Sequence, residues 1–394
     1  MRKRSTTRSE RRTRLSGIEA AAKAFDAFRP ARDVLSVVRA VPTRFVQFDH
    51  ATKVGGLPIE RFTLMHGPSG EGKTAMSLGL LASFLARDHL AMLVDAERTT
   101  PITWARAMMG RYADHPGFFA VRPRTYEETV ETVRKFVMTI KKQRDEGTLS
   151  EDTSGIIIVD SIRKLVPEGL LKRIFAEVKD HANKPKGIDG MGGRGAQIKA
   201  AMNAQWMDEL VPLLEETGTA FVCLTRETDD PDASTQDKMA GRDFKVGGGK
   251  ALYYDGSMVL RVERASFVAD SGDDEGKNKT MFGERHLVTI RKSKVAGREE
   301  FTTRAYFHTS NGNLIPPGFD RARDVVTLAE QFEIVEKRGA WFSYGDQRLG
   351  QGINGVVKNL TENEALLDEI EQAVRDSFKK HEPMEVNEET GEVA

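Results

Sequence analysis

The chain of 394 residues has a single cysteine, no long apolar run and no net charge. That cysteine, Cys223, excludes an internal disulfide and is typical of a reducing compartment. It lies in the apolar segment 219–224, which predicts a buried strand and leaves a catalytic thiol as the alternative. The basic start of the chain continues into polar residues, unlike a secretory signal, and no apolar run approaches the length of a membrane span. We therefore expect a cytoplasmic protein without membrane contact.

Equal numbers of basic and acidic residues, 59 of each, provide no overall attraction to nucleic acid. The charges are nevertheless unevenly placed along the chain. Residues 2–14 contain seven Arg and Lys against one Glu, and residues 382–394 contain five Glu and no basic residue. A basic arm and an acidic tail are common in proteins that bind nucleic acid, with a solvated terminus as the alternative for each.

Residues 67–74 form a complete G-x-x-x-x-G-K-[ST] phosphate-binding loop. The loop follows the apolar run 62–65 and precedes a helical pattern from residue 75, which is the context that the motif requires. Glycines let the backbone N–H groups turn toward phosphate oxygens, and the helix N-terminus adds a positive dipole. We expect a nucleoside triphosphate on this loop, with the Lys73 ammonium on its phosphates and the Thr74 hydroxyl on Mg²⁺. The binding residues are Gly67, Pro68, Ser69, Gly70, Glu71, Gly72, Lys73 and Thr74.

Short apolar runs alternate with helical stretches from about residue 44, which predicts βαβ units around a largely parallel sheet. Strands are expected at 62–65, 91–94, 117–121, 155–159 and 220–224, and helices at 74–87, 125–145 and 197–216. Two polar segments break this pattern and read as long functional loops, at 168–195 and 227–250. Extended segments follow at 257–264, 286–291 and 301–307, with an acidic hairpin tip at 268–282. Residues 323–376 are expected to form a small helical unit with one hairpin near 341–345.

Two of these strands end in acidic residues, on the side where α/β sheets bind ligands. Asp160 ends the aliphatic run 155–159, so we expect its carboxylate beside the phosphate loop, holding Mg²⁺ through water; a strand-end cap is the alternative. Glu97 follows the run 91–94, where a carboxylate could polarise the water that attacks the γ-phosphate. Asp95 is better suited to bracing the strand end. The spacing alone is equally compatible with Glu97 being an ordinary glutamate on the surface.

Three further residues are candidates for contacts with the nucleotide. Trp104 could stack on a base, or it could pack in the core, as tryptophans of amphipathic helices more often do. Lys292 and Lys294 end the extended segment 286–290 and point the same way, because alternate residues of a strand share a face. They could clamp phosphates from a neighbouring subunit, as an arginine finger does, or form an exposed basic strand end.

In order and spacing, these landmarks resemble the bacterial RecA family of ATP-dependent DNA strand-exchange recombinases, from about Val41 to Asp376. The matching pieces are residues 55–58, the phosphate loop, and residues 95–97, 159–161, 247–252, 292–294, 337–344 and 350–352. Each piece is short, but their common order along most of the chain is specific. The C-terminal pieces are absent from most other ATPases that share the core.

The resemblance implies an α/β fold, with a RecA-like P-loop ATPase core built on a mostly parallel twisted sheet. It adds an N-terminal helix, expected at 16–28, and a small α+β C-terminal domain. It also divides the chain into four parts, which are a basic disordered arm with an oligomerisation helix (1–40), an ATPase and DNA-binding core (41–315), a C-terminal domain (316–376) and an acidic disordered tail (377–394).

For the site, the resemblance implies ATP with Mg²⁺. Lys73 and Thr74 match the residues that bind the phosphates and the metal. Glu97 matches the water-activating glutamate of the family, and Asp160 matches its second acidic motif. ATP hydrolysis is therefore expected to use these four side chains.

Four other positions carry implications of the same kind. Trp104 falls where the family has an adenine-stacking tyrosine. Lys292 and Lys294 match a pair that reaches the ATP of the neighbouring protomer, so hydrolysis would depend on filament assembly. Arg226 stands where the family has a glutamine that senses the γ-phosphate and orders the second DNA loop. An arginine can still contact the phosphate, but it is a stronger and less switchable partner.

The segments 168–195 and 227–250 fall where the family places its DNA-contacting loops. Flexible basic loops can follow a phosphate backbone, with solvated surface loops as the alternative. The candidate DNA-binding residues are Lys179, Lys184, Lys186, Arg194, Lys238, Arg242 and Lys245. Five aspartates in the second loop are unusual for such a segment, at Asp229, Asp230, Asp232, Asp237 and Asp243. These departures and the arginine-rich start indicate a divergent member, compatible with a bacteriophage source.

We therefore expect a DNA-dependent ATPase that coats single-stranded DNA as a helical homofilament, tests double-stranded DNA for complementarity and exchanges strands in recombination and repair. One alternative is a motor with a related core, such as a helicase or branch-migration factor. The Lys292 and Lys294 pair and the C-terminal pieces argue against a motor. The other alternative is an ATP-regulated scaffold on single-stranded DNA without strand exchange, for which Arg226 leaves room.

Overall fold

The computed structural model describes residues 38–172, 192–239, 244–269, 281–295, 301–308 and 318–378. From Arg39 on, these residues belong to one compact unit. The basic arm, the helix expected at 16–28 and the acidic tail lie outside the described residues. Within the described ranges, no helix has the length and apolar character needed to cross a membrane.

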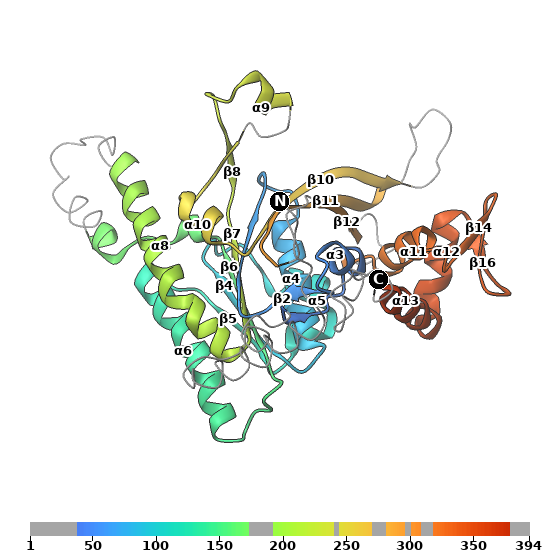
Figure 1. Cartoon of the computed structure of the whole chain (residues 1–394), viewed down its shortest axis with the longest axis horizontal. Helices are drawn as coiled ribbons and strands as arrows, with labels where there is room; N and C mark the ends of the chain where they lie inside the picture. Colours follow the sequence, from blue (N-terminus) through green and yellow to red (C-terminus); the bar gives the residue numbers. More distant parts are fainter. Residues whose placement is uncertain are drawn as a thin grey trace, which may run out of the picture. The chain divides into compact units, whose positions relative to one another are not determined.

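A nine-stranded sheet forms the centre of the unit, in the order β13-β12-β11-β10-β3-β7-β6-β4-β5 (Figure 1). Its parallel strands are β3 (Phe62–His66), β4 (Leu90–Asp95), β5 (Phe118–Val121), β6 (Gly155–Asp160), β7 (Thr219–Leu224) and β10 (Met258–Ala269). The antiparallel extension contains β11 (Met281–Ser293), β12 (Phe301–His308) and β13 (Gly318–Phe319). The predicted mostly parallel sheet is confirmed, with all five strands that the sequence predicted before residue 225.

Helices cover both faces of the parallel strands, as Figure 1 shows. On one face lie α6 (Tyr126–Asp145) and α8 (Gly192–Thr217), and on the other α4 (Lys73–Leu85) and α5 (Ile102–Met109). In β6, Ile157 and Val159 pack toward α6 and α8, while Ile156 and Ile158 pack into the core that contains α4. Alternate side chains of a strand point to opposite faces, so a strand covered on both sides needs this continuous aliphatic run.

Short elements complete the unit around the sheet. β1 (Ala40–Val41) pairs with β2 (Leu57–Pro58), and α3 (Val46–Ala51) lies between them in the chain. Two 3₁₀ helices follow larger elements, η1 (Gly110–Asp114) after α5 and η2 (Ile162–Lys164) after β6. None of these short elements was expected from the sequence, because they carry no repeated apolar pattern.

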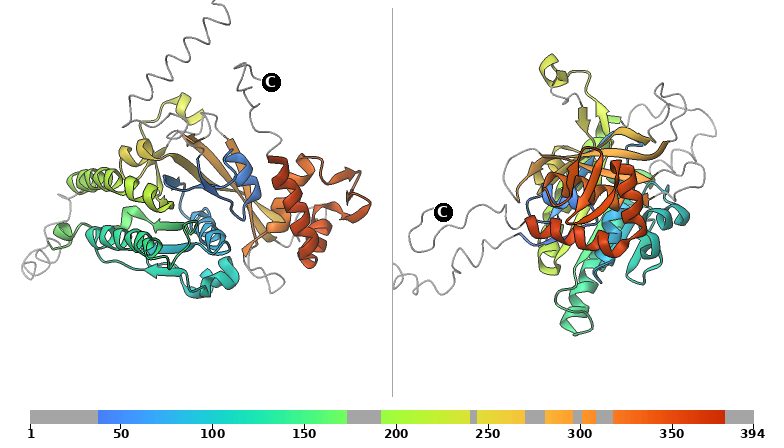
Figure 2. Two further views of the ribbon diagram at one scale, coloured as in Figure 1. Left: turned by 60° about the horizontal axis from the view of Figure 1, so that its bottom comes forward. Right: turned by 90° about the vertical axis from the view of Figure 1, so that its right-hand side faces the viewer.

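The segment 227–250 is not the structureless loop that the sequence indicated. It contains an antiparallel pair, β8 (Glu227–Asp229) and β9 (Phe244–Val246), with α9 (Thr235–Met239) between them, and α10 (Lys250–Asp255) begins at its end. Figures 1 and 2 show this hairpin projecting from the sheet. The prediction was wrong because contacts with residues far away in the sequence, described below, stabilise the two short strands. In the first segment α8 already begins at Gly192, and residues 173–191 lie outside the described ranges.

The C-terminal region is the small α+β unit that we expected, with more strand than predicted. Its helices are α11 (Arg321–Gln331), α12 (Gly352–Glu362) and α13 (Glu364–Phe378). A three-stranded antiparallel sheet replaces the single expected hairpin and contains β14 (Glu336–Arg338), β15 (Trp341–Tyr344) and β16 (Gln347–Gln351). Phe342 and Leu349 of this sheet are buried against the helices in one core. β14 was missed because its three residues are all exposed and charged.

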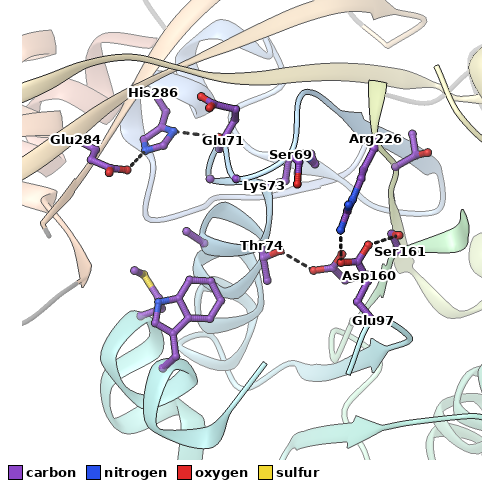
Figure 3. A pocket seen from close by; sticks show the side chains of 16 residues that line it. Ser69, Glu71, Lys73, Thr74, Glu97, Asp160, Ser161, Arg226, Glu284 and His286 are labelled. Carbon is purple, nitrogen blue, oxygen red and sulfur yellow. Dashed lines mark hydrogen bonds and ion pairs between the residues drawn. The ribbon is translucent and has the colours of Figure 1, made fainter. Parts of the chain in front are cut away.

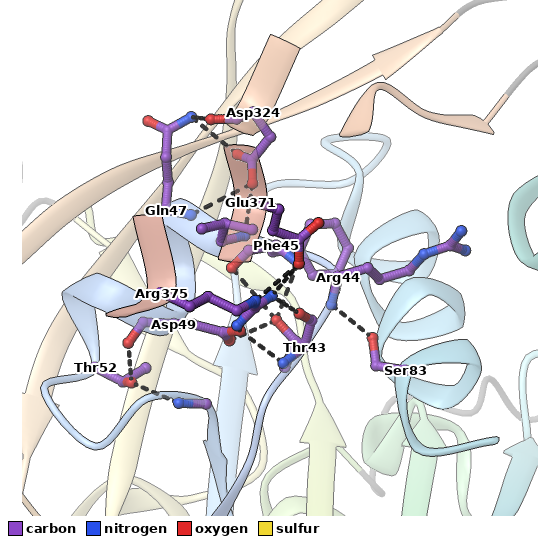
Figure 4. Close-up of polar contacts among 12 residues, drawn as sticks. Thr43, Arg44, Phe45, Gln47, Asp49, Thr52, Ser83, Asp324, Glu371 and Arg375 are labelled. Atoms are coloured by element: carbon purple, nitrogen blue, oxygen red, sulfur yellow. Dashed lines mark hydrogen bonds and ion pairs between the residues drawn. The ribbon is translucent and has the colours of Figure 1, made fainter. Parts of the chain in front are cut away.

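Two buried carboxylates join α3 to the C-terminal helices (Figure 4). Asp324 of α11 accepts hydrogen bonds from the backbone N–H of Val46 at 2.6 Å and from the side-chain amide of Gln47 at 2.9 Å. Asp49 of α3 forms an ion pair with Arg375 of α13 at 2.9 Å. Val46 itself packs in the core of the C-terminal region. The contact between these two parts of the chain is therefore both apolar and ionic.

Substitution of Asp324 tests how much its charge contributes to this contact. Burial raises the pKa of Asp324 well above its ordinary value of 3.8, so the folded state holds the proton more tightly than the unfolded state. This contribution to stability is complete below the unfolded pKa and is lost as pH rises through the folded pKa. Asp324→Asn cannot ionise, so we expect its urea-unfolding free energy to increase relative to that of the wild type as pH rises above about 4, the ordinary pKa of an aspartate.

Two further variants make this measurement specific. Asp324→Ala removes the acceptor for Val46 and Gln47, so we expect a loss of about 2–5 kcal/mol at any pH. Asp368→Asn is the matched control, because its carboxylate is 63% exposed, and we expect it to change the free energy of unfolding by less than about 1 kcal/mol. A difference between Asp324→Asn and the wild type that stays constant with pH would contradict the interpretation.

Candidate nucleotide-binding site

A cavity of about 460 Å³ opens where β3, β4, β6 and β7 end (Figure 3). Its wall contains the predicted phosphate loop after β3, Glu97 after β4, Asp160 at the end of β6 and Arg226 after β7. Trp104 of α5 lies in the same wall. The structure therefore brings most of the residues that the sequence predicted for the nucleotide and its metal to one cavity, although Gly67 and Pro68 of the loop do not line it.

The phosphate loop depends on glycine where other segments approach its backbone. Gly72 has a φ of +87°, and a Cβ there would lie 2.6 Å from the ring of His286. At Gly67 a Cβ would lie 2.1 Å from the carbonyl oxygen of Val262. Gly72 is also the residue before α4, so no side chain caps this helix, and its first turn contains no acidic residue. The N–H groups of that turn are thus oriented for an anion.

Lys73 is buried in the loop with its ammonium held by backbone carbonyls. Its Nζ donates to the carbonyl oxygens of Gly67, at 2.9 Å, and Pro68. Burial lowers the pKa of Lys73, and the nearby Asp160 carboxylate opposes that effect. A phosphate group would give this cation a charged partner that the two neutral carbonyls do not.

Thr74 and Asp160 form a pair suited to Mg²⁺. The Thr74 hydroxyl donates to Asp160 Oδ2 at 2.6 Å, and Asp160 is almost fully buried. Burial raises the pKa of Asp160 to about 6, so the protein alone does not compensate its negative charge. No cluster of three metal-binding His, Cys, Asp or Glu side chains occurs among the described residues. Mg²⁺ typically uses one or two protein oxygens together with phosphates and water, and these two side chains fit that mode.

Glu97 has a partner on each carboxylate oxygen. Ser161 donates its hydroxyl to Oε1 at 2.8 Å, and Arg226 donates a guanidinium N–H to Oε2 at 2.7 Å. Burial acts to raise the pKa of Glu97, but the bonds from Ser161 and Arg226 outweigh it, so the pKa is lowered. Sequence analysis did not select Ser161, although its place directly after Asp160 was a usable signal.

Asp95 braces the end of β4, as its position indicated. Its carboxylate accepts from Arg122 Nε at 2.9 Å and from the backbone N–H groups of Thr99 and Thr100. These bonds fix the turn that carries Glu97 toward the cavity. Asp95 therefore braces the end of the strand, whereas Glu97 lines the cavity.

Comparison with known proteins identifies the family. The model of the RecA N-terminal domain matches residues 31–304, and that of the RecA C-terminal domain matches residues 323–379. This chain belongs to the RecA family. The Protein RecA of Chlorobaculum tepidum is 29% identical over 339 residues, which cover 86% of this chain and 84% of that protein. The Protein RecA of Aquifex aeolicus is 27% identical over 354 residues, which cover 89% and 88%. The expected resemblance is confirmed, and the low identity is that of a divergent RecA-type protein.

Trp104 has features of both roles that the sequence left open, which are stacking on a base and packing in the core. It is half-buried against the core around α4, and it also lines the cavity. The RecA family resemblance predicts an adenine contact at this position. An indole held by core packing on one side can offer its other side to a base, so the prediction stands.

Lys292 and Lys294 do not line the cavity of their own subunit. They lie at and just beyond the end of β11 and reach toward α10, as alternate residues of an extended strand should. Lys292 Nζ donates to the carbonyl oxygens of Tyr253 and Tyr254 at 2.9 and 2.6 Å, and Lys294 Nζ donates to that of Asp255 at 3.5 Å. Their expected role at the ATP of a neighbouring RecA-type protomer stays a prediction.

The predicted DNA-binding residues are only partly described. Lys179, Lys184, Lys186 and Arg242 lie outside the described residues, and Arg194 lies in α8 without a described side chain. Lys238 of α9 is exposed. Lys245 of β9 is also exposed, but its ammonium lies 2.7 Å from Asp230 and 3.6 Å from Asp232. Two of the unusual aspartates of the second segment are therefore ion-pair partners of one of its candidate DNA-binding lysines.

A buried network attaches this second segment to the phosphate loop. The carboxylate of Glu227, directly after Arg226, lies 2.7 Å from His66 Nδ1 and 2.9 Å from Arg261 Nε. The Arg261 guanidinium lies 4.8 Å from the ring centre of Phe244 in β9. The backbone N–H of Glu227 also donates to the carbonyl of Gly67. Sequence analysis missed this network because its members come from four separate segments.

His286 and Glu284 of β11 were also missed. His286 Nδ1 lies 3.0 Å from the carbonyl oxygen of Glu71, and its Nε2 lies 3.0 Å from Glu284. Both side chains line the cavity beside the phosphate loop. They lie more than 200 residues after the loop in the chain, so no local pattern links them to it.

Removing the Glu227 carboxylate should destabilise the protein strongly. Glu227→Ala leaves Arg261 and His66 without the acceptor that they share in a buried site, and breaking such a pair costs about 3–5 kcal/mol. The measurement is the free energy of urea unfolding. Glu263→Ala is the matched control, because this carboxylate also pairs with Arg261 at 2.8 Å but is 32% exposed. We expect the control to lose less than about 1 kcal/mol, and equal losses would contradict the assignment.

Proposed function

We propose that this protein is an ATP-dependent DNA recombinase. It binds ATP with Mg²⁺, forms helical homofilaments on single-stranded DNA, pairs that strand with homologous duplex DNA and exchanges the strands. The observation that carries the proposal is the convergence of Lys73, Glu97 and Asp160 on one cavity, in a chain with both RecA domains. The proposed setting is DNA recombination and repair in the cytoplasm.

ATP hydrolysis follows from the chemistry of the cavity wall. Glu97 orients a water molecule toward the γ-phosphate and accepts its proton. Lys73, Arg226 and the N–H groups of the first turn of α4 stabilise the negative charge that develops on the phosphate oxygens. Thr74 and, through water, Asp160 would hold Mg²⁺, which would neutralise part of that charge. Trp104 holds the adenine ring.

Filament formation completes the active site in this proposal. Lys292 and Lys294 do not line the cavity of their own subunit and donate to carbonyl oxygens of α10, which supports a role at the ATP of the next protomer. Each nucleotide would then be enclosed by two subunits, so that hydrolysis requires assembly. The proposed division of the chain remains an arm with a helix (1–40), a core (41–315), a C-terminal domain (316–376) and an acidic tail (377–394).

DNA binding is proposed for the segments 168–195 and 227–250, through their basic residues. Contacts of this kind go mainly to the phosphate backbone, and base pairing between strands supplies the sequence specificity. A second candidate function is an ATP-regulated scaffold on single-stranded DNA without strand exchange. The ion pairs of Lys245 with Asp230 and Asp232 favour this candidate, because they weaken the second segment as a DNA contact.

Lys73→Ala tests the proposed use of ATP. The variant lacks the cation at the phosphates, so we expect ATP hydrolysis to fall at least about 100-fold and ATP-dependent binding of a labelled single-stranded oligonucleotide to be lost. Phosphate release and fluorescence anisotropy measure these two quantities. Lys135→Ala, at an exposed lysine of α6, is the matched control and should behave as the wild type. Retained strand exchange by Lys73→Ala would contradict the proposal.

Three assays separate recombinase from scaffold and from motor. Single-stranded DNA should stimulate ATP hydrolysis, and circular single strands with linear duplex should yield exchanged products. Electron microscopy with DNA and a slowly hydrolysed ATP analogue should show helical filaments. DNA binding without exchange or stimulated hydrolysis would favour the scaffold, and rings would indicate a motor.

A further inference from the structure

The carboxylate proposed to activate water has a protein partner on each of its two oxygens. Ser161 donates a hydrogen bond to one carboxylate oxygen of Glu97 at 2.8 Å, and Arg226 donates to the other at 2.7 Å. The backbone N–H of Glu97 donates to the carbonyl oxygen of Asp160 at 3.0 Å, which fixes the chain on the other side of the carboxylate. A water molecule cannot replace either partner without breaking a charge-assisted or hydroxyl hydrogen bond.

Arg226 is the partner that can leave. Its side chain is 39% exposed, whereas that of Glu97 is 12% exposed. Ser161 is buried at the end of β6 and directly follows Asp160, so its hydroxyl has little freedom. The Arg226 guanidinium also lines the cavity opposite the phosphate loop, as Figure 3 shows. It can therefore reach either the carboxylate or a phosphate in the cavity by rotation of its own side chain.

The backbone around Arg226 is fixed, which limits the exchange to that side chain. The N–H of Thr225 donates to the carbonyl of Met65, and the N–H of Glu227 donates to that of Gly67. The Thr225 hydroxyl donates to the carbonyl oxygen of Gly247 at 2.9 Å. The buried network of Glu227 holds the following residue in place.

We propose that Arg226 is a latch on Glu97 that the γ-phosphate of ATP opens, which makes the site distinguish ATP from ADP. The inference rests on the proposed function and adds a positioning role to it. Without a γ-phosphate, the guanidinium stays on Glu97 and holds it away from water. With ATP bound, the guanidinium moves to the γ-phosphate and leaves one oxygen of Glu97 for the attacking water. After phosphate release the ion pair forms again. The RecA family resemblance places a glutamine where this chain has Arg226, and a neutral glutamine cannot form this ion pair.

The latch has a thermodynamic consequence that can be measured without hydrolysis. ATP must break the Arg226–Glu97 pair before it gains the guanidinium, whereas ADP leaves the pair intact. Removing the charge of Glu97 should therefore increase the affinity for ATP but not for ADP. If the latch exists, this increase in ATP affinity should occur only in chains that contain Arg226. If Glu97 merely repels the phosphates, the increase should also occur in chains without Arg226.

The experiment is a double-mutant cycle on nucleotide affinity. Calorimetry with Mg²⁺ and without DNA gives dissociation constants of ADP and of the imido analogue of ATP for the wild type, Glu97→Gln, Arg226→Gln and the double variant. We expect Glu97→Gln to bind the analogue roughly three- to tenfold more tightly, with ADP affinity changed by less than about twofold. Arg226→Gln should weaken the analogue alone. In the Arg226→Gln background, Glu97→Gln should change the affinity for the analogue by less than about twofold.

Glu71→Gln provides a matched control for loss of charge. Glu71 also lines the cavity, but its carboxylate lies 3.6 Å from Arg264, not beside Arg226. Its effect on the affinity for the analogue should be the same in both backgrounds. Thermal unfolding of each variant without nucleotide verifies that it is folded. If Arg226→Gln fails to fold, Arg226→Met, which keeps an apolar side chain without the charge, takes its place in the cycle.

Each outcome decides the inference. Equal tightening by Glu97→Gln in both backgrounds, or equal tightening of ADP and the analogue, would overturn the latch and leave the proposed ATPase intact. Failure of the wild type to bind the analogue at all would overturn the ATPase and the latch together. Tightening that is limited to the analogue and to chains with Arg226 would support the latch.

Discussion

The parallel register of β3, β7, β6 and β4 is the constraint on which the site depends. Met65 lies opposite Leu224, and Asp95 lies opposite Asp160. The residues that follow these strands therefore emerge along one edge of the sheet, where α/β proteins bind ligands. A shift of one residue in any strand would turn its side chains to the opposite face. The buried aliphatic runs prevent that shift, so the core that stabilises the fold also positions the candidate catalytic groups.

The polar groups at this edge already have hydrogen-bond partners within the protein. Arg226 pairs with Glu97, Thr74 donates to Asp160, and Lys73 donates to backbone carbonyls. Nucleotide binding is thus an exchange of partners: phosphate oxygens compete for groups that already have hydrogen bonds. Affinity in such a site depends on the difference between old and new partners, which is how a single ion pair can influence the choice between ATP and ADP.

Two buried carboxylates away from the cavity connect distant parts of the chain. Glu227 links the end of β3 and the middle of β10 to the hairpin of β8 and β9, and Asp324 links α11 to α3. A buried carboxylate is costly unless its acceptors are filled, so each of these groups favours one arrangement of its partners. The proposed DNA-contacting hairpin consequently has a fixed root beside the phosphate loop, even though its outer surface carries opposing charges.

The sequence by itself determined the phosphate loop, the parallel sheet with its five central strands, the small C-terminal unit and the candidate roles of Glu97, Asp160 and Trp104. Those features have local causes, which are glycine spacing, continuous aliphatic runs and acidic residues at strand ends. Tertiary structure alone decided that Arg226 meets Glu97, that His286 packs on Gly72, and that short strands form in the segment 227–250. Arg226 and Glu97 are 129 positions apart in the chain, and His286 and Gly72 are 214 apart. The short strands depend on similar long-range contacts. In each case the order of the strands in the sheet decides which residues meet. No local pattern of side chains encodes that order, because it arises only when the whole core packs.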